Sequence, residues 1–503
     1  MNFEFIISMH RNCFYTIILL ALLLPSVPMM AQKGKKGKSA PACDIVFNVA
    51  GAHDTSLCLT IMYNGKYIIK DTADYISPGV FHCKNEQPLQ EGFYTLVSNK
   101  SKPYLTFIMP ANQRFSVSLD TTANVNAISF KNSPENDEML LFQRKASESQ
   151  KKLNAYRKQQ TANKDNQDSV DFYAAKIKEL NEEMKSFIMD LIERNPNYLF
   201  SKMQRAGREI ELPEPDTNNP EFLPAYYRQH YWDNIDLTDS RLIFTPVFEP
   251  KMKEYFGHVL QYQDVDTINK YVDMVLERAA VDSLMYRYCI DWVSRYYETS
   301  KYIGHDGVFV HIVKNNQLQG KCTWMDETLL RQYAKRISHI EPLLIGTKAV
   351  ELIIPDTTQS SDMRTWISSH HLPKEYTVLW FFDPDCPKCN KQTTLLKHLY
   401  DSLETAGTRN FDVYAIGNDS DVERWKKYVR DKKLPWYNVG GNRGNVDYLT
   451  IYNIYESGNP SMFIINRKKE IILNRSIDVT AIPDFLKQYE AIEAKKAAAA
   501  KKD

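Results

Sequence analysis

Two cysteines, Cys386 and Cys389, lie two residues apart within VLWFFDPDCPKCNKQ, residues 378–392. A C-x-x-C pair can be half of a zinc site, a covalent haem attachment point, a structural disulfide or a redox-active pair. The apolar run before the pair has the length of a buried strand, and the residues after it have a helical pattern. We therefore expect the pair at a strand-to-helix junction.

Metal and haem chemistry fit this pair poorly. A zinc site needs two more ligands at suitable spacing, and the sequence has no second C-x-x-C. His370 and His371 are adjacent in an expected loop, and His398 lies about three turns along the following helix. Covalent haem needs histidine directly after the second cysteine, where Asn390 stands. We expect neither a metal nor an organic cofactor.

A redox-active pair is the interpretation that the surrounding residues support best. A disulfide that closes four residues restricts the unfolded chain little, so it is more useful as a bond that opens and closes. If a helix begins near Cys386, its free N–H groups and its dipole favour a thiolate there. Pro387 suits the first helical turn, and Lys388 adds a positive charge, whereas Asp385 opposes it. The balance predicts an activated Cys386.

The composition is that of a folded globular protein with more than one domain. The chain has 503 residues, of which 43% are hydrophobic and 25% charged, and its net charge is +1. Length predicts two to four domains. The balanced charge gives no reason to expect nucleic acid as a partner.

The N-terminus predicts export. An apolar stretch ending in a proline and small residues predicts a signal peptide over residues 1–31, with Met9 as an alternative start of translation. A single N-terminal membrane anchor is the alternative. A flexible basic linker, residues 32–42, is expected to follow. We therefore expect the protein in the periplasm or cell envelope, where disulfides can persist.

Differences in composition and hydrophobic periodicity divide the rest of the chain into three predicted domains and a tail. Short β-branched and aromatic runs predict a small all-β sandwich or barrel over residues 43–131, with a hairpin turn at Asn64-Gly65. Helical periodicity predicts a mostly α-helical domain over 132–345. Alternating strands and helices predict an α/β domain over 346–490, including a helix over 445–454. Residues 491–503 are expected to form a helical or disordered tail.

Other residues in the helical region have structural interpretations. Apolar side chains from Val170 to Leu191 recur every three or four positions and predict one face of a long helix. The aromatic residues in this region are expected to pack between helices in the core, with a ligand groove as the alternative. The stretch His230–Asn234 is expected to be a packed helix end.

The remaining cysteines are expected to be structural. Cys58 and Cys83 could pair across strands, but two free thiols are the favoured interpretation. Cys289 is expected in a helical core, and Cys322 is expected to be free.

The C-terminal motifs resemble a known family. A strand, C-P-K-C, a helix and a later SGNPSMFIINRKKEII resemble the thioredoxin fold, in particular TlpA-like exported thiol–disulfide oxidoreductases. The resemblance covers roughly residues 343–490. It implies Cys386 as nucleophile, Cys389 as resolving cysteine and Pro460 as the cis-proline beside them. The preceding regions resemble the uncharacterised β and helical domains of secreted thioredoxin-like proteins of Gram-negative bacteria.

Four positions depart from the family pattern. Asp385 replaces the usual tryptophan, and Gln392 replaces a glutamate three residues past the second cysteine. Trp380 replaces the buried acid of thioredoxins, and Asn459 precedes the cis-proline where threonine or valine is common. Two carboxylates that handle protons in the family are therefore missing.

The resemblance implies dithiol–disulfide exchange with protein substrates. The Cys386-Cys389 disulfide is then the redox centre, and the backbone of Asn459 is expected to pair with an extended substrate chain. A reductant role, which we favour over oxidation, implies an electron donor at the membrane. The rival hypothesis is a cell-envelope binding or assembly protein whose thioredoxin-like module has little or no activity.

Overall fold

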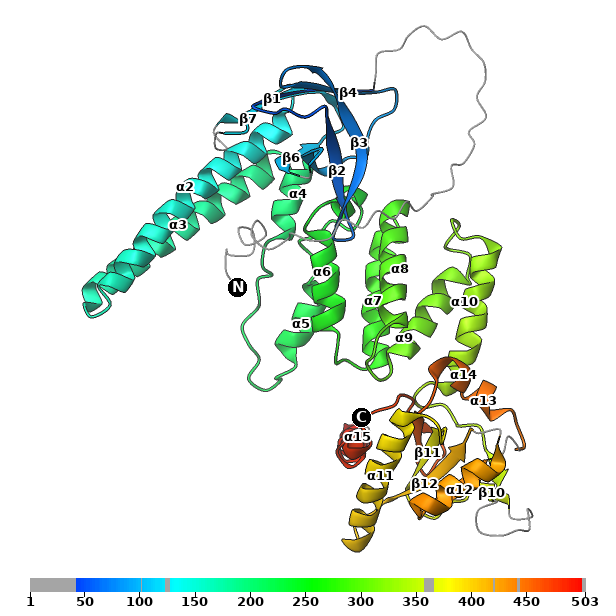
Figure 1. Cartoon of the computed structure of the whole chain (residues 1–503). Helices are drawn as coiled ribbons and strands as arrows, with labels where there is room; N and C mark the ends of the chain where they lie inside the picture. Colours follow the sequence, from blue (N-terminus) through cyan, green and yellow to red (C-terminus); the bar gives the residue numbers. More distant parts are fainter. Residues whose placement is uncertain are drawn as a thin grey trace, which may run out of the picture.

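The computed structural model describes residues 42–100, 102–122, 127–356, 366–418, 421–440 and 444–499. They form an N-terminal β domain, a helical middle domain and a C-terminal α/β domain, so the predicted fold class is confirmed (Figure 1). The expected signal peptide and the linker up to residue 41 lie outside the described residues. Among the described helices, none is both long and apolar enough to cross a membrane.

The β domain is one eight-stranded sheet with the order β6-β5-β2-β3-β4-β1-β7-β8. Its strands are β1 (Cys43–Ala50), β2 (Ser56–Tyr63), β3 (Lys66–Ser77), β4 (Val80–Asn85), β5 (Gly92–Ser98), β6 (Pro103–Met109), β7 (Gln113–Asp120) and β8 (Ser129–Lys131). The hairpin prediction is confirmed, because Asn64 and Gly65 join β2 to β3 with φ angles of 50° and 70°, as a tight primed turn requires.

The described cysteines of the β domain are free thiols. The alternative pairing of Cys58 with Cys83 is wrong, because β3 lies between their strands. Cys58 is also partly exposed, whereas Cys83 is buried. The neighbour of Cys83 is Cys43 on β1, with whose thiol it forms a hydrogen bond that lowers the pKa of Cys43.

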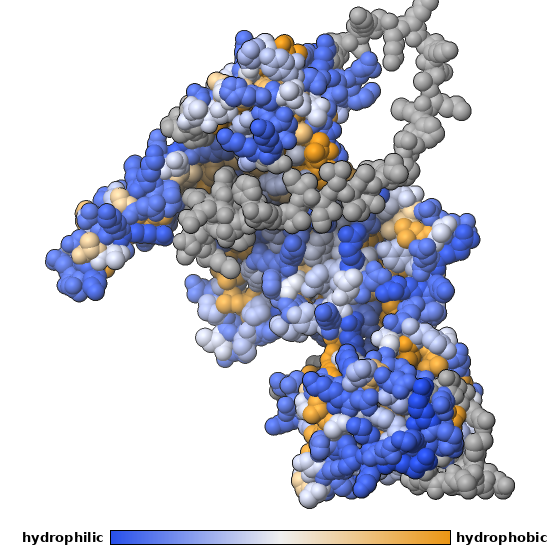
Figure 2. Space-filling view, in the orientation of Figure 1, coloured by the Kyte–Doolittle hydropathy of each residue, from blue (hydrophilic) through white to orange (hydrophobic). Residues whose placement is uncertain are grey.

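The middle domain is helical from residue 134 to residue 343. Its elements are α2 (Pro134–Ala162), α3 (Gln167–Arg194), α4 (Leu199–Ala206), α5 (Phe222–His230), η2 (Ser240–Phe244), α6 (Phe248–Glu254), η3 (Tyr255–Val259), α7 (Val265–Ala279), α8 (Ser283–Glu298), α9 (His305–Ile312), η4 (Val313–Gln317), α10 (Glu327–Ile340) and η5 (Glu341–Leu343). The predicted long helix is α3, and it forms with α2 an arm that projects from the molecule (Figure 1). The visible surface of this arm is largely hydrophilic (Figure 2).

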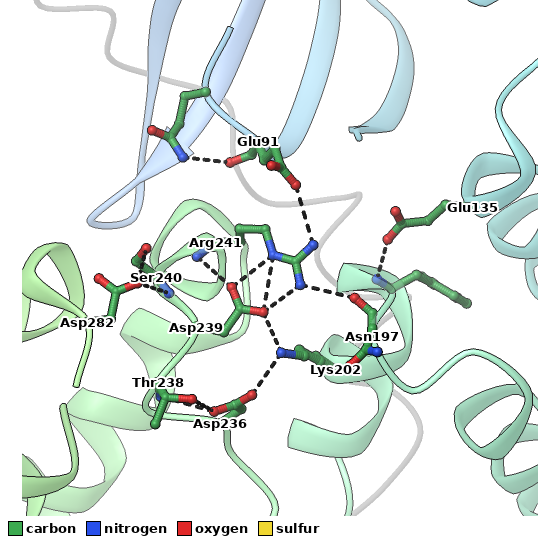
Figure 3. A network of polar contacts seen from close by, with 12 residues as sticks. Glu91, Glu135, Asn197, Lys202, Asp236, Thr238, Asp239, Ser240, Arg241 and Asp282 are labelled. Atoms are coloured by element: carbon green, nitrogen blue, oxygen red, sulfur yellow. Dashed lines mark hydrogen bonds and ion pairs between the residues drawn. The ribbon is translucent and has the colours of Figure 1, made fainter. Parts of the chain in front are cut away.

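The β and helical domains share one hydrophobic core, in which the Tyr63 ring stacks on Phe244. The aromatic side chains of the helical domain belong largely to this core, and Cys289 is buried in it. A polar network crosses the same junction (Figure 3). Arg241 of η2 forms ion pairs with Asp239 at 2.6 Å and with Glu91 of the β domain at 3.4 Å.

The C-terminal domain has a five-stranded sheet with the order β13-β12-β11-β14-β15. Its elements are β11 (Tyr376–Phe382), α11 (Pro387–Thr405), β12 (Phe411–Gly417), α12 (Val422–Lys432), β13 (Tyr437–Gly440), α13 (Tyr448–Ile451), α14 (Ile454–Ser457), β14 (Ser461–Ile465), β15 (Ile471–Leu473), η6 (Val479–Ala481) and α15 (Ile482–Ala499), preceded by a small ribbon of β9 (Ile353–Pro355) and β10 (Trp366–Ser368). Strands β11, β12 and β13 run parallel, whereas β14 and β15 are each antiparallel to their neighbours in the order.

Both faces of this sheet are covered, which explains why β11 and β12 are buried along their whole length. Trp380 and Phe382 of β11 pack with α11, α12 and α15 on one face. Phe381 packs on the other face with α13 and α14. The single helix expected over 445–454 is wrong, because Asn453, with φ 53°, separates α13 from α14.

Candidate active site

Cys386 lies at the junction between β11 and α11, as expected. Between them, residues 383–385 form a tight turn, in which the Asp385 N–H donates to the Asp383 carboxylate at 2.8 Å. The Cys386 N–H donates to the Asp383 carbonyl at 3.1 Å. The turn ends with Cys386 as the N-cap of α11 and Pro387 in the first helical turn.

The Cys386 sulfur accepts a hydrogen bond from the backbone N–H of Cys389 at 3.2 Å. This N–H is one of the donors that a helix N-terminus leaves without an internal partner. A thiolate at this position therefore gains both a hydrogen bond and the favourable end of the helix dipole. Cys386 is also partly exposed, so an incoming disulfide can reach it.

Cys389 has the opposite environment. Its side chain is fully buried, with 0% of it exposed. Burial, the hydrogen bond to Cys386 and the nearby Asp383 charge raise the pKa of Cys389 to about 12, although the Asp383 N–H acts in the other direction. Cys389 therefore remains a protonated thiol near neutral pH.

Pro460 lies beside the pair. The Asn459-Pro460 peptide bond is cis, as the resemblance implied. The Cys386 thiol donates to the Asn459 carbonyl at 3.6 Å, and the Asn418 amide donates to the Asn459 side chain at 2.8 Å. The Ser476 hydroxyl donates to the Pro460 carbonyl at 3.0 Å. The loop before β14 is thus held against the first cysteine.

The charged neighbours differ from the sequence-based expectation. Asp385, which was expected to oppose the thiolate, forms an ion pair with Arg424 of α12 at 2.7 Å. Lys388 has an exposed side chain. Because both members of the ion pair are largely exposed, its effect is modest, but it partly neutralises the carboxylate next to Cys386.

Gln392 points to a neighbouring segment rather than to the cysteines. Its amide donates to the Asp478 carboxylate at 3.3 Å and accepts from the Val479 N–H at 3.2 Å. A glutamate here would place two carboxylates together. The neutral amide at this departure from the family pattern therefore fits its surroundings.

The position of the family's buried acid is filled by a buried indole. The Trp380 ring donates to the Thr393 hydroxyl at 3.1 Å. The carboxylate that does influence Cys389 belongs to Asp383. Asp383 was not expected to handle protons, and Arg424 was not expected at the site. Asp383 was detectable in the turn itself, whereas Arg424 has no motif that relates it to the cysteines.

A buried parallel strand, a C-x-x-C pair capping the next helix and a cis-proline against the first sulfur define a thioredoxin-fold domain. A family model described as thioredoxin-like matches residues 374–471. Through this domain the chain belongs to the thioredoxin-like family. A second model, a domain of unknown function named DUF5106, matches residues 201–341.

Several solved structures resemble the chain. A thioredoxin-like protein from Bacteroides caccae is 18% identical, with a TM-score of 0.42, over 56% of this chain and 98% of that one. A domain of a possible thiol-disulfide isomerase from Cytophaga hutchinsonii is 30% identical, with a TM-score of 0.27, over 31% and 98% of the two chains. The thioredoxin domain of a thiol-disulfide oxidoreductase from Bacteroides vulgatus is 18% identical, with a TM-score of 0.24, over 29% and 96%. No protein of curated function matches the chain.

Proposed function

We propose that this protein is an exported thiol–disulfide oxidoreductase that reduces disulfides of proteins in the periplasm or cell envelope. The observation that carries the proposal is the asymmetry of the cysteine pair. Cys386 is accessible and its sulfur receives an N–H donor, whereas Cys389 is buried and its pKa is raised. Such a pair suits one attacking and one resolving thiol.

In the first step the Cys386 thiolate attacks one sulfur of a substrate disulfide. A bond forms between Cys386 and that sulfur, and the other substrate sulfur leaves as a thiolate that takes up a proton. In the second step Cys389 loses its proton and attacks the Cys386 sulfur. The second substrate thiol is released, and the pair is left as an internal disulfide.

The substrate gains two electrons from the cysteine pair and two protons, one released by Cys389 and one taken from solvent, to which Cys386 lost its own proton on forming the thiolate. A dithiol donor must therefore reduce the Cys386-Cys389 disulfide before the next cycle, and an electron donor at the membrane would fill this role. The backbone at Asn459 is the element against which an extended substrate chain would lie.

The test is reduction of insulin disulfides by the purified chain with a small dithiol as donor. We expect Cys386→Ser to abolish the reaction and Cys389→Ala to accumulate mixed disulfides with substrate proteins. Cys58→Ser is the matched control, because Cys58 is also partly exposed but lies in the β domain. Wild-type activity no higher than that of Cys386→Ser, with no trapped partner, would favour a binding or assembly role.

A further inference from the structure

The segment Asn474–Val479, which follows β15, contacts three parts of the molecule in succession. We name it the bridging segment. Its first two residues contact the helical domain, Ser476 contacts the cis-proline, and its last two residues contact the helix that carries the cysteines. It is therefore a physical connection between the helical domain and the candidate active site.

The contact with the helical domain is polar and partly buried. The Asn474 amide donates to the Asp306 carboxylate and, at 3.0 Å, to the Leu343 carbonyl. The Arg475 guanidinium donates to the Ser300 carbonyl. Asp306 lies in the first turn of α9, and its second carboxylate oxygen is buried without a hydrogen-bond partner in the described structure.

Arg475 supplies the positive charge at this junction. Burial raises the pKa of Asp306, and the charge of Arg475 is the first influence that acts against it. Removing the guanidinium would leave the Ser300 carbonyl without this donor and the Asp306 carboxylate without its counter-charge. Both losses are costly in a partly buried contact, so the segment is expected to move.

The contact with the active site begins at the next residue. The Ser476 hydroxyl donates to the Pro460 carbonyl at 3.0 Å, and the Asn459 carbonyl of the same loop accepts from the Cys386 thiol at 3.6 Å. A shift of the bridging segment therefore has a short route to Cys386. The covalent steps on this route, from Arg475 to Ser476 and from Pro460 to Asn459, each join neighbouring residues.

A second, weaker contact joins the helical domain to α14, which precedes the cis-proline loop in the chain. Glu456 of α14 is 4.0 Å from both Arg336 and His339 of α10. Arg336 also pairs with Glu298 of α8 at 2.6 Å. These side chains are about one-third to one-half exposed, so this contact is expected to contribute little compared with the bridging segment.

We propose that Arg475 is a positioning residue through which the helical domain holds the Asn459-Pro460 loop in register with Cys386. The proposal rests on the proposed function, because that loop is where the substrate chain would lie. Its consequence is that the helical domain takes part in exchange without touching the reacting sulfurs. A protein substrate, which must pair with the loop, depends on this contact more than a small disulfide does.

The test compares Arg475→Ala and Arg475→Lys with Arg467→Ala in the full chain. Arg467 is the matched control, because it lies in the same domain, is largely exposed and forms an ion pair with Glu375, far from the bridging segment in the sequence. Two quantities are measured: the rate at which iodoacetamide alkylates Cys386 at pH 7, and kcat and KM for insulin and for a small aromatic disulfide.

We expect Arg475→Ala to raise the Cys386 alkylation rate at least threefold, because the thiol loses the aligned Asn459 acceptor. KM for insulin should rise about tenfold, whereas kcat/KM for the small disulfide should not fall. Arg475→Lys, which keeps the charge and a donor, should restore most of both values. Equal results for Arg475→Ala and Arg467→Ala would overturn the proposal.

Two other results, an inactive wild-type chain and an unfolded Arg475→Ala variant, would not by themselves decide the role of Arg475. If the wild-type chain reduces no disulfide, the proposed function fails, but the alkylation comparison still decides the role of Arg475. If Arg475→Ala does not fold, as judged by circular dichroism, Ser476→Ala replaces it, because this change removes only the hydroxyl that reaches Pro460. An alkylation rate for Ser476→Ala equal to that of the wild type would then refute the proposal.

Discussion

The backbone N–H of Cys389 lies 3.2 Å from the sulfur of Cys386 and donates a hydrogen bond to it. One residue thus stabilises the charged form of its partner's thiol while its own thiol is buried and its pKa is raised. The two sulfurs of the pair therefore differ in their hydrogen bonds and in access before any substrate arrives. This difference explains why Cys386 is expected to attack first and Cys389 second.

Alkylation should reveal this asymmetry. In the reduced protein, we expect iodoacetamide to modify Cys386 at pH 7–9 while Cys389 stays unmodified, because only thiolates react and the pKa of Cys389 is about 12. The two sites are distinguished by mass spectrometry of peptides. Modification of Cys389 at pH 8 in the folded protein would contradict the structure.

Because the pKa of Cys389 is raised, the free energy of unfolding of the reduced domain should fall as the pH rises above 9. The pKa of Cys389 is raised from its ordinary value of 9.0, so above pH 9 the folded state keeps a proton that the unfolded state loses. Its contribution to stability is complete below pH 9 and is lost as the pH rises toward about 12. Urea unfolding between pH 8 and pH 10 should show this loss in the wild type and a smaller one in Cys389→Ala.

The sequence predicted the local part of the site well. The strand 376–382, the helix that begins after Cys386 and the cis bond at Pro460 depend on short patterns, such as an apolar run, a proline in the first turn and a family motif. The ion pair between Asp385 and Arg424 depends instead on how α12 packs beside the turn. Nothing in the spacing of these residues indicates that contact.

The fold shows the same division. The Asn64-Gly65 hairpin is set by residues that adopt positive φ readily, so sequence alone predicts it. The break between α13 and α14 at Asn453 lies inside a pattern that favours one helix, and the two short helices cover one face of the sheet. Tertiary packing outweighed local propensity there.

Asp383 is expected to accept the proton of Cys389 in the second step. Its carboxylate is close enough for its charge to raise the pKa of that thiol, and the family's buried acid is replaced by Trp380. Asp383→Asn should slow the release of substrate from the mixed disulfide on the order of a hundredfold, the scale of general base catalysis. Rapid quenching followed by mass spectrometry measures this step.

Asp385→Asn is the control for Asp383→Asn. Asp385 lies in the same turn but is largely exposed and paired with Arg424. Asp385→Asn should leave the rate of the second step within about threefold of the wild-type rate. A second step that is as fast in Asp383→Asn as in Asp385→Asn would exclude Asp383 as the proton acceptor.

Arg424 should protect the reactivity of Cys386. Arg424→Ala leaves the Asp385 carboxylate without its ion-pair partner in the turn before Cys386, and a free negative charge disfavours a thiolate. We expect the alkylation rate of Cys386 to fall about twofold at low ionic strength. The difference should shrink in 1 M salt, where exposed charges are screened. Arg430→Ala, on the same helix, is the control, and a difference that persists in high salt would contradict an electrostatic cause.

The Asp239 network should stabilise the junction between the β and helical domains (Figure 3). Burial alone would raise the pKa of Asp239, but hydrogen bonds from Arg241 and Lys202 outweigh it and lower the pKa to about 2. A shift of this size corresponds to about 2 kcal/mol of stability at neutral pH. Asp239→Asn is expected to lose that amount, as measured by urea unfolding at pH 7.

The pH dependence separates this electrostatic contribution from simple packing. Because the pKa of Asp239 is lower in the folded state, its contribution is complete above about pH 4 and is lost as the pH falls toward 2. The stability difference between wild type and Asp239→Asn should therefore be largest at pH 7 and shrink steadily below pH 4. Asp236→Asn, which removes a more exposed partner of Lys202, should cost less at pH 7. A difference for Asp239→Asn that stays constant from pH 7 to pH 3 would mean that shape, rather than charge, makes this residue important at the junction.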